Sequence, residues 1–369
     1  MFRIIIFLII NLCKCTNYIY TEISNIDVAY YIDLEFESKM KSKCLPLVMN
    51  LGFSYINGQL SYSKNIESMG QTYISYVNQP QLKANIFKDK IFFKNTNLSL
   101  NSFQYLYLDQ HRSDGAISLA YTFMDQKFDI IHQMYNDKLI NKKNFAFYID
   151  SLFRGKLFFG GIPPNLTKIY KYSQSCQVRG GNFCGCDLYE VKYVNKIYNN
   201  IHLSFFQSDF NVILVPFDFF EQYFKEVIEG YILNRTCTIR EIGKKVEYEC
   251  NCQELDYFPS ISFQFYNFEI TFTRNDLFLN YTRVCYFSIK NNYNSINNWE
   301  FGLPAFKKYI VQFDYGENWI RFYSEDPSFG NKRYMHNYFG IIKILCIILI
   351  IISSALSIIV LIINYSKHF

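Results

Sequence analysis

The chain has 369 residues, of which 50% are hydrophobic, 19% aromatic and 19% charged. This composition excludes a disordered, collagen-like or low-complexity protein, because enough apolar surface is present to build a large core. The 37 Lys and Arg exceed the 32 Asp and Glu by only 5. Since no basic stripe is present, we do not expect a nucleic-acid partner.

The first 16 residues have the pattern of a secretory signal peptide. Arg3 precedes an apolar run over residues 4–12, which is followed by Cys-Lys-Cys-Thr, and we place the cleavage after Cys15 or Thr16. This run of nine residues, interrupted by Asn11, is too short to span a bilayer, so an uncleaved anchor is the disfavoured alternative.

The body that follows reads as short, aromatic-rich strands interrupted by two helices. Strand-like runs occupy residues 30–36, 91–93, 156–159 and 261–270. A first helix is predicted over residues 128–139, because Phe128, Ile131, Tyr135 and Leu139 share one face. A second helix is predicted to begin near Pro216. The asparagine-rich residues 291–298 predict a polar surface loop.

Two lobes are expected. Residues 160–164, Gly-Gly-Ile-Pro-Pro, punctuate the middle of the chain, and a cysteine cluster follows at residues 176–186. We place the lobes at residues 17–175 and 176–330, each of ordinary domain size.

The cysteines of the body indicate disulfides. The eight that lie between the two ends are Cys44, Cys176, Cys184, Cys186, Cys237, Cys250, Cys252 and Cys285. An even number in a secreted chain is typical of a disulfide framework. The Cys-x-Cys pairs lack a companion at zinc-site spacing and histidine is rare, so no metal or cofactor is expected. Four sequons, at Asn97, Asn165, Asn234 and Asn280, predict glycosylation.

A second apolar run, residues 344–363, is long enough to cross a membrane as a helix, since 1.5 Å per residue gives roughly 30 Å. With the signal peptide it predicts a single-pass protein with a juxtamembrane segment at 331–343 and a cytoplasmic tail at 364–369. The body is then expected in the secretory pathway or at the cell surface. A lipid-anchor signal is disfavoured, because such tails usually end in a hydrophobic run and this chain ends Tyr-Ser-Lys-His-Phe.

Several segments, in order, resemble the pepsin-like aspartic proteases. Residues 301–322, which begin Phe-Gly-Leu-Pro-Ala-Phe, are similar to the closing run of that family, and residues 114–121, Asp-Gly-Ala-Ile-Ser-Leu-Ala-Tyr, resemble a first-lobe turn. Residues 145–148, Phe-Ala-Phe-Tyr, and 157–162, Leu-Phe-Phe-Gly-Gly-Ile, resemble segments that follow this turn in the family. The spacing from Cys252 to Pro259, Phe263 and Cys285 is similar to the second-lobe disulfide loop.

This resemblance implies an all-β, bilobal fold, here with a C-terminal transmembrane helix. It also implies a bridge from Cys285 to Cys252 or to Cys250, and we count Cys237 with these as a disulfide cysteine.

The family's chemistry needs one aspartate from an Asp-Thr/Ser-Gly turn in each lobe, so that two carboxylates share a proton. Placing residues 47–54 on the first turn puts Asn50 at the catalytic position and Gly52 at the glycine. Counting nine residues back from Pro216 puts Gln207 at the second catalytic position and Asp209 at the second glycine. Amides do not titrate, so the resemblance implies that no catalytic pair is present.

We therefore predict a membrane-anchored pseudoprotease that binds a peptide or protein between its lobes, in a cleft containing Gly52, Tyr76 and Asp209. Tyr76 resembles the family's flap tyrosine. A surface scaffold, with the cleft closed by Phe53 and Phe210, fits the same residues.

The alternative is an active aspartic endopeptidase whose turns lie elsewhere. A different hydrolase or a metalloenzyme is disfavoured, because Gly-x-Ser-x-Gly and His-Glu-x-x-His motifs are absent from the sequence. An unrelated all-β receptor or adhesin remains a further hypothesis.

Overall fold

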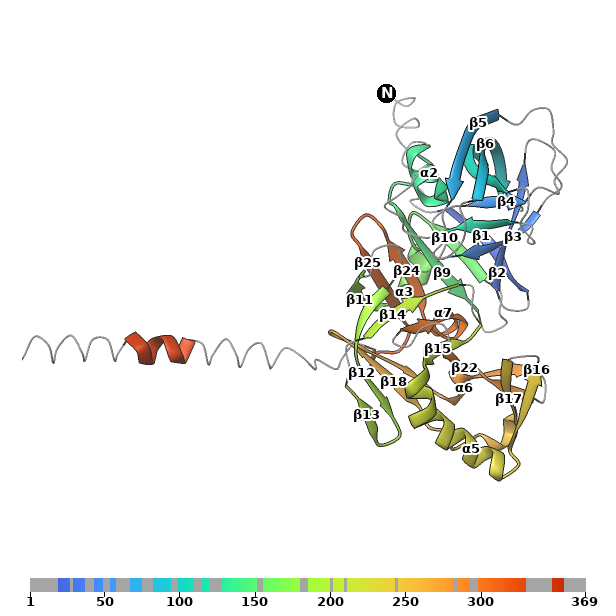
Figure 1. Cartoon of the computed structure of the whole chain (residues 1–369). Helices are drawn as coiled ribbons and strands as arrows, with labels where there is room; N and C mark the ends of the chain where they lie inside the picture. Colours follow the sequence, from blue (N-terminus) through green and yellow to red (C-terminus); the bar gives the residue numbers. More distant parts are fainter. Residues whose placement is uncertain are drawn as a thin grey trace, which may run out of the picture.

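The computed structural model describes residues 19–26, 29–36, 43–48, 54–57, 67–74, 82–93, 99–108, 115–119, 128–150, 155–179, 185–199, 202–208, 211–242, 245–281, 284–292, 298–329 and 347–354. These residues form a β-rich body, with the first half of the chain above the second in the view of Figure 1.

The first half supplies ten strands, β1 (Ile19–Ile26), β2 (Ala29–Phe36), β3 (Lys43–Val48), β4 (Tyr55–Asn57), β5 (Glu67–Ile74), β6 (Leu82–Phe93), β7 (Ser99–Leu108), β8 (Gly115–Ser118), β9 (Asn144–Ile149) and β10 (Gly155–Phe159). All belong to one sheet, which is continued by three strands of the second half.

The described residues of the second half contain β11 (Tyr172–Gln177), β12 (Gly185–Tyr193), β13 (Lys196–Tyr198), β14 (His202–Phe206), β15 (Ile213–Pro216), β16 (Cys237–Ile242), β17 (Lys245–Asn251), β18 (Ile261–Phe265), β19 (Glu269–Phe272), β20 (Phe278–Tyr281), β21 (Val284–Phe287), β22 (Ile289–Asn292), β23 (Trp299–Phe301), β24 (Ile310–Asp314) and β25 (Trp319–Ser324).

The helical segments are short. They are α2 (Ile130–Asn136), α3 (Pro164–Ile169), α4 (Phe217–Phe219), the π-helical η2 (Phe220–Phe224), α5 (Lys225–Leu233), the 3₁₀-helical η3 (Cys252–Glu254), α6 (Arg274–Leu277) and α7 (Leu303–Lys308). The two predicted helices are present as α2 and as the run from α4 to α5. Helix α2 begins after Asp129, whose carboxylate accepts from the backbone N–H of Ile131, and it ends before Lys138, which has a φ of 58°.

A shared sheet joins the halves. In the order β11-β25-β24-β9-β10-β1, strands of the second half lie directly beside strands of the first. Phe145 on β9 faces Phe313 on β24, with ring centroids 4.9 Å apart, and both side chains are buried. The aromatic runs of the sequence thus form one core that crosses the boundary between the halves.

One predicted loop is partly a strand. Asn291 and Asn292, the first residues of the predicted polar loop at 291–298, belong to β22, which pairs in parallel with β15. Asn292 is only 3% exposed, and its amide donates to the carboxylate of Glu300 at 2.9 Å. The prediction was wrong here because the parallel pairing with β15 places both residues in a strand, and the bond to Glu300 gives the buried amide of Asn292 a partner inside the fold.

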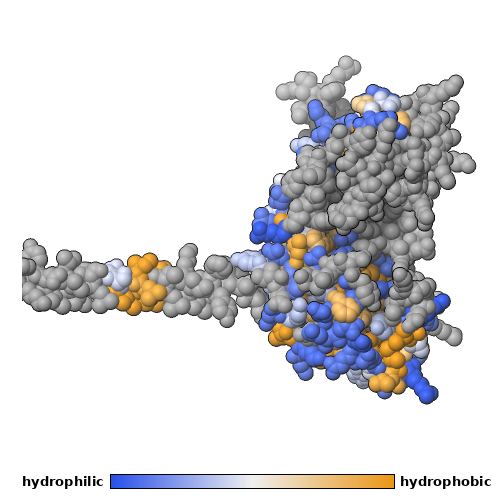
Figure 2. All heavy atoms as spheres, in the orientation of Figure 1, coloured by the Kyte–Doolittle hydropathy of each residue, from blue (hydrophilic) through white to orange (hydrophobic). Residues whose placement is uncertain are grey.

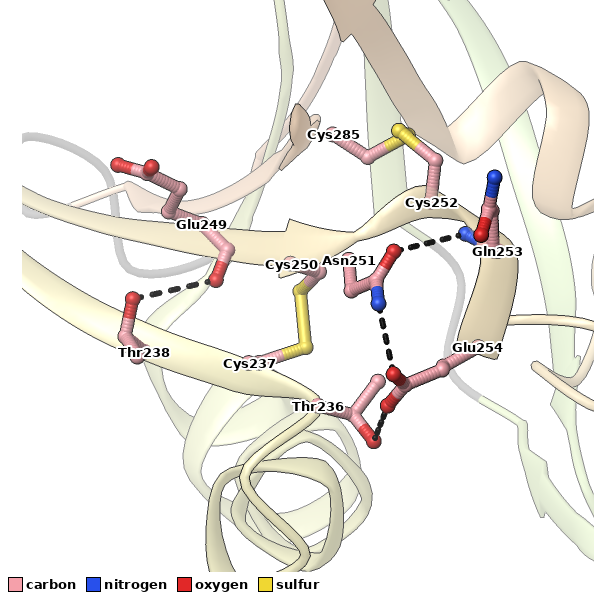
Figure 3. Close-up of a disulfide and its surroundings, with 10 residues drawn as sticks. All are labelled: Thr236, Cys237, Thr238, Glu249, Cys250, Asn251, Cys252, Gln253, Glu254 and Cys285. Atoms are coloured by element: carbon pink, nitrogen blue, oxygen red, sulfur yellow. Dashed lines mark hydrogen bonds between the residues drawn. A yellow bond between two sulfur atoms is a disulfide. The ribbon is translucent and has the colours of Figure 1, made fainter. Parts of the chain in front are cut away.

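Three disulfides cross-link the second half, Cys176–Cys186, Cys237–Cys250 and Cys252–Cys285. The last selects one of the two pairings that the resemblance left open for Cys285. Figure 3 shows the latter two bridges, which start from Cys250 near the end of β17 and from Cys252 at the start of η3, with Glu254 receiving hydrogen bonds from Asn251 and Thr236. The side chains of Cys44 and Cys184 lie outside the described residues.

At the C-terminal end, residues 347–354 form a helix whose surface is mostly apolar in Figure 2. Within the described ranges, no helix has both the length and the apolar character needed to cross a membrane. The predicted transmembrane segment at 344–363 is only partly covered by those ranges, and the predicted signal peptide lies wholly outside them.

Candidate functional site

The two halves repeat one four-strand arrangement. In the first half, β8 lies between β3, which runs parallel to it, and β4, which runs antiparallel, and β4 pairs in parallel with β7. In the second half, β23 lies in the same way between β14 and β15, and β15 pairs in parallel with β22. The chain therefore contains two topologically equivalent loops, one from β3 to β4 and one from β14 to β15.

These two loops carry the predicted catalytic turns, and each spans six residues, 49–54 and 207–212. Asn50 is the second residue of its loop, whereas Gln207 is the first of its own, so the topology places them at similar but not identical points. Asn50, Gly52, Tyr76 and Asp209 lie outside the described residues, as do Phe53 and Phe210.

The first loop ends in an anchored serine. The hydroxyl of Ser54 accepts a hydrogen bond from the backbone N–H of Ser118 at 3.0 Å, its carbonyl accepts from Leu106, and its N–H donates to the carbonyl of Phe128. Ser54 is fully buried. Through these three hydrogen bonds the serine holds the start of β4 to β7, to β8 and to Phe128.

Gln207 lies directly after β14 and is 7% exposed. Its backbone N–H donates to the carbonyl of Phe301 at 2.9 Å, which continues the pairing of β14 with β23 by one residue. Its side-chain oxygen is buried and accepts no hydrogen bond within the described part of the chain. Because a buried acceptor without a donor is unfavourable, this position is a candidate for contact with a ligand.

One face of this sheet is apolar core and the other is mixed. Phe206, Ile213 and Phe301 are fully buried on the core face. Successive residues of a strand point to opposite faces, so Phe205, Leu214 and Glu300, which are cross-strand neighbours, share the other face. Gln207 follows Phe205 by two residues and joins them there.

Glu300 is the carboxylate of this face and is partly buried. Burial raises its pKa above the ordinary value, and the hydrogen bond from Asn292 opposes that rise. A partly desolvated carboxylate of this kind is stabilised when a cation or a further donor reaches it.

A pocket of about 210 Å³ lies at the edge of the same region. It is lined by Asn211, Val212, Glu247, Leu279, Tyr286, Phe287 and Lys290. The ammonium of Lys290 donates to the carboxylate of Glu247 at 3.0 Å, so the charged groups of the pocket neutralise each other. Asn211 connects the pocket to the loop that begins with Gln207.

Sequence reasoning identified Gln207 but missed Glu300 and the pocket, because only the strand register brings these residues together. Of the predicted glycosylation sites, Asn165 and Asn234 are exposed at the surface, Asn97 lies outside the described residues, and Asn280 belongs to β20. Among the described residues, no group of His, Cys, Asp and Glu is arranged to hold a metal ion.

Comparison with known protein families identifies a match over most of the chain. The model of the eukaryotic aspartyl protease family matches residues 55–324, nearly three quarters of the chain, beginning at β4 and ending with β25. No match was found among curated proteins. The matched segment contains the whole β14–β15 loop and the three disulfides, and it begins after Asn50. With the duplicated strand arrangement and the shared sheet, this match over most of the chain leads to one conclusion: the chain belongs to the eukaryotic aspartyl protease family.

Proposed function

We propose that this protein is a membrane-anchored member of the aspartyl protease family that binds an extended peptide or a protein segment between its lobes and does not cleave it. The observation that carries the proposal is the residue at the start of the β14–β15 loop. Gln207 stands where the family resemblance places a catalytic aspartate, and its amide neither titrates nor transfers a proton.

The surroundings of Gln207 support binding. The face that carries Gln207 also holds partly exposed Leu214 and Glu300, so apolar and polar contacts are both offered to a ligand. Pockets that combine apolar walls with a few polar groups are typical of ligand sites. An extended segment would add backbone hydrogen bonds of the kind made between strands.

Three disulfides fit an oxidising compartment. The apolar run at residues 344–363 supports anchoring of the body at a membrane of the secretory pathway, with the glycosylated lobes on the luminal or outer side.

The test is peptide cleavage by the purified full-length protein. A diverse peptide library is incubated between about pH 3.5 and 7, where aspartic proteases with a shared proton would work, with and without pepstatin. Products are read by mass spectrometry, and binding of uncleaved peptides is measured in parallel.

The expected result is retention of some peptides without cutting. Cuts that pepstatin abolishes would overturn the proposal and establish the alternative, an active endopeptidase whose turns lie elsewhere. A folded protein that neither cuts nor retains peptides would favour the scaffold interpretation instead.

A further inference from the structure

Two side chains on one face of the sheet, Gln207 and Glu300, have oxygen atoms that could accept further hydrogen bonds. The side-chain oxygen of Gln207 is buried and accepts no hydrogen bond from any described residue. The carboxylate of Glu300 accepts a hydrogen bond from Asn292, and no cation among the described residues contributes to its charge environment. A buried or partly buried acceptor is unfavourable until a donor reaches it.

The strand register brings these acceptors together. Phe205 lies opposite Glu300 in the parallel pairing of β14 with β23, and the N–H of Gln207 extends this pairing through its bond to Phe301. Gln207 is therefore a diagonal neighbour of Glu300 on the same face. Diagonal neighbours on one face of paired strands come within reach of one another through long side chains.

Apolar side chains flank Glu300 on both neighbouring strands. Phe205 is 7% exposed, and its ring lies so close to Gly185 that an added Cβ there would be 2.9 Å from Cδ1. Leu214, on β15, is cross-strand to Glu300 and is partly exposed. The two walls offer contact to an aliphatic stem, while Glu300 and Gln207 offer acceptors to its tip.

Lys290, a described cation of this face, does not partner Glu300. Lys290 lies on β22 and pairs with Leu214 of β15, whereas Glu300 pairs with Leu214 from β23, so one strand separates Lys290 from Glu300. Its ammonium is held by Glu247 at 3.0 Å. The cation that would complete Glu300 therefore has to come from outside the described residues of this chain.

We propose that Glu300 and Gln207 form a subsite for a basic side chain of the bound peptide, with Glu300 accepting a guanidinium or ammonium group, Gln207 accepting a second N–H, and Phe205 and Leu214 contacting the stem. This inference rests on the proposed function, because it names the chemistry of the peptide held between the lobes. Arginine fits best, since its planar guanidinium presents five N–H donors to two separate acceptors.

The experiment uses the full-length protein and an array of random short peptides made in matched versions. One central position carries arginine, citrulline or glutamate, and all other positions are unchanged. Citrulline keeps the shape of arginine but removes its charge. The protein variants are Glu300→Gln and, as a control, Glu226→Gln, which alters an exposed carboxylate of α5 that pairs with Lys196 of β13.

The wild-type protein and Glu226→Gln are expected to bind arginine peptides at least about tenfold more tightly than their citrulline versions, and glutamate versions more weakly still. Glu300→Gln is expected to lose this preference while still retaining peptides. Free agmatine, added as a competitor, is expected to displace arginine peptides only at concentrations well above that of an equivalent peptide.

Equal binding of arginine and citrulline versions by the wild-type protein would overturn the subsite and leave the proposed function standing. An unchanged preference in Glu300→Gln would do the same. Retention of no version by the folded protein would overturn peptide binding itself, and the subsite with it. Agmatine that competes as well as a whole peptide would assign the site to a free amine instead.

Discussion

The carboxylate of Asp129 lies 2.5 Å from Nδ1 of His132, and both side chains are almost completely buried. The same carboxylate accepts from the backbone N–H of Ile131 at 2.8 Å and so caps helix α2. Burial raises the pKa of Asp129, and its contacts with His132 and the backbone oppose that rise. The side chain of Asp129 therefore caps helix α2 and also provides a hydrogen-bond partner for the buried ring of His132.

Asp129→Ala is expected to lower the free energy of unfolding by about 3 kcal/mol, because it removes a helix cap and leaves His132 buried without its partner. Urea unfolding of the purified protein measures the change. The control is Glu226→Ala, which removes a fully exposed ion pair with Lys196 and should have almost no effect. A loss for Asp129→Ala no larger than that of the control would contradict this account of α2.

Two glycines offer a matched pair of substitutions. A Cβ added to Gly185 would meet the ring of Phe205 at 2.9 Å and the carbonyl oxygen of Ser204 at 3.0 Å, whereas one added to Gly230, in α5, would meet nothing within 4 Å. Gly185→Ala is expected to destabilise the protein by about 1–3 kcal/mol. Gly230→Ala should stabilise it by about 0.5–1 kcal/mol, because alanine favours the helix. Thermal unfolding of both variants is the measurement, and effects of the same sign would show that Phe205 does not lie against β12 as described.

The disulfides differ in the length of chain that they close. Cys252–Cys285 has a sequence separation of 33, and Cys237–Cys250 one of 13. Since a bridge mainly restricts the unfolded chain, replacing Cys252 and Cys285 by serine should lower the free energy of unfolding by about 4 kcal/mol, and the Cys237 and Cys250 replacement by about 3 kcal/mol. Denaturant unfolding of the two double variants gives the order, and peptide mapping without reduction verifies the pairing. Recovery of a Cys250–Cys285 linked peptide from the wild-type protein would contradict the connectivity.

The burial of Glu300 should make the free energy of unfolding depend on pH. Its pKa is raised above the ordinary 4.5, so the folded state holds the proton more tightly than the unfolded state does. The free energy of unfolding contributed by this group therefore falls as the pH rises from about 4.5 through the raised pKa. Glu300→Gln is expected to be more stable than wild type at about pH 7 and nearly equal to it at about pH 4.

The control for this prediction has the opposite sign. Lys196 lowers the pKa of the fully exposed Glu226, so Glu226→Gln should lose a little stability at neutral pH. Unfolding curves at the two pH values decide between these outcomes. A destabilised Glu300→Gln at neutral pH would mean that an unseen cation already partners this carboxylate. If the variant instead gains stability and loses arginine preference, loss of folding cannot account for the loss of binding.

Local patterns predicted the elements well. Helix α2 and the run from α4 to α5 follow from apolar spacing and from Pro216, and strands β2 and β10 follow from aromatic-rich runs of strand length. The site depends on long-range pairing instead. Glu300 and Gln207 are far apart in sequence, and only the parallel register of β14 with β23 makes them neighbours. The sequence predicts a surface loop at Asn292 because a polar amide by itself favours solvent. Its hydrogen-bond partner, Glu300, is brought next to it only by the folding of the chain.

The shared sheet also dictates when the molecule can finish folding. Phe145 on β9 pairs with Phe313 on β24, so the strand that closes the edge of the first half is among the last parts of the body to leave the ribosome. Until then β9 presents an unpaired edge and an uncovered aromatic row to other chains. The order of the strands therefore leaves the sheet of the first half with an open edge until β24 has been synthesised.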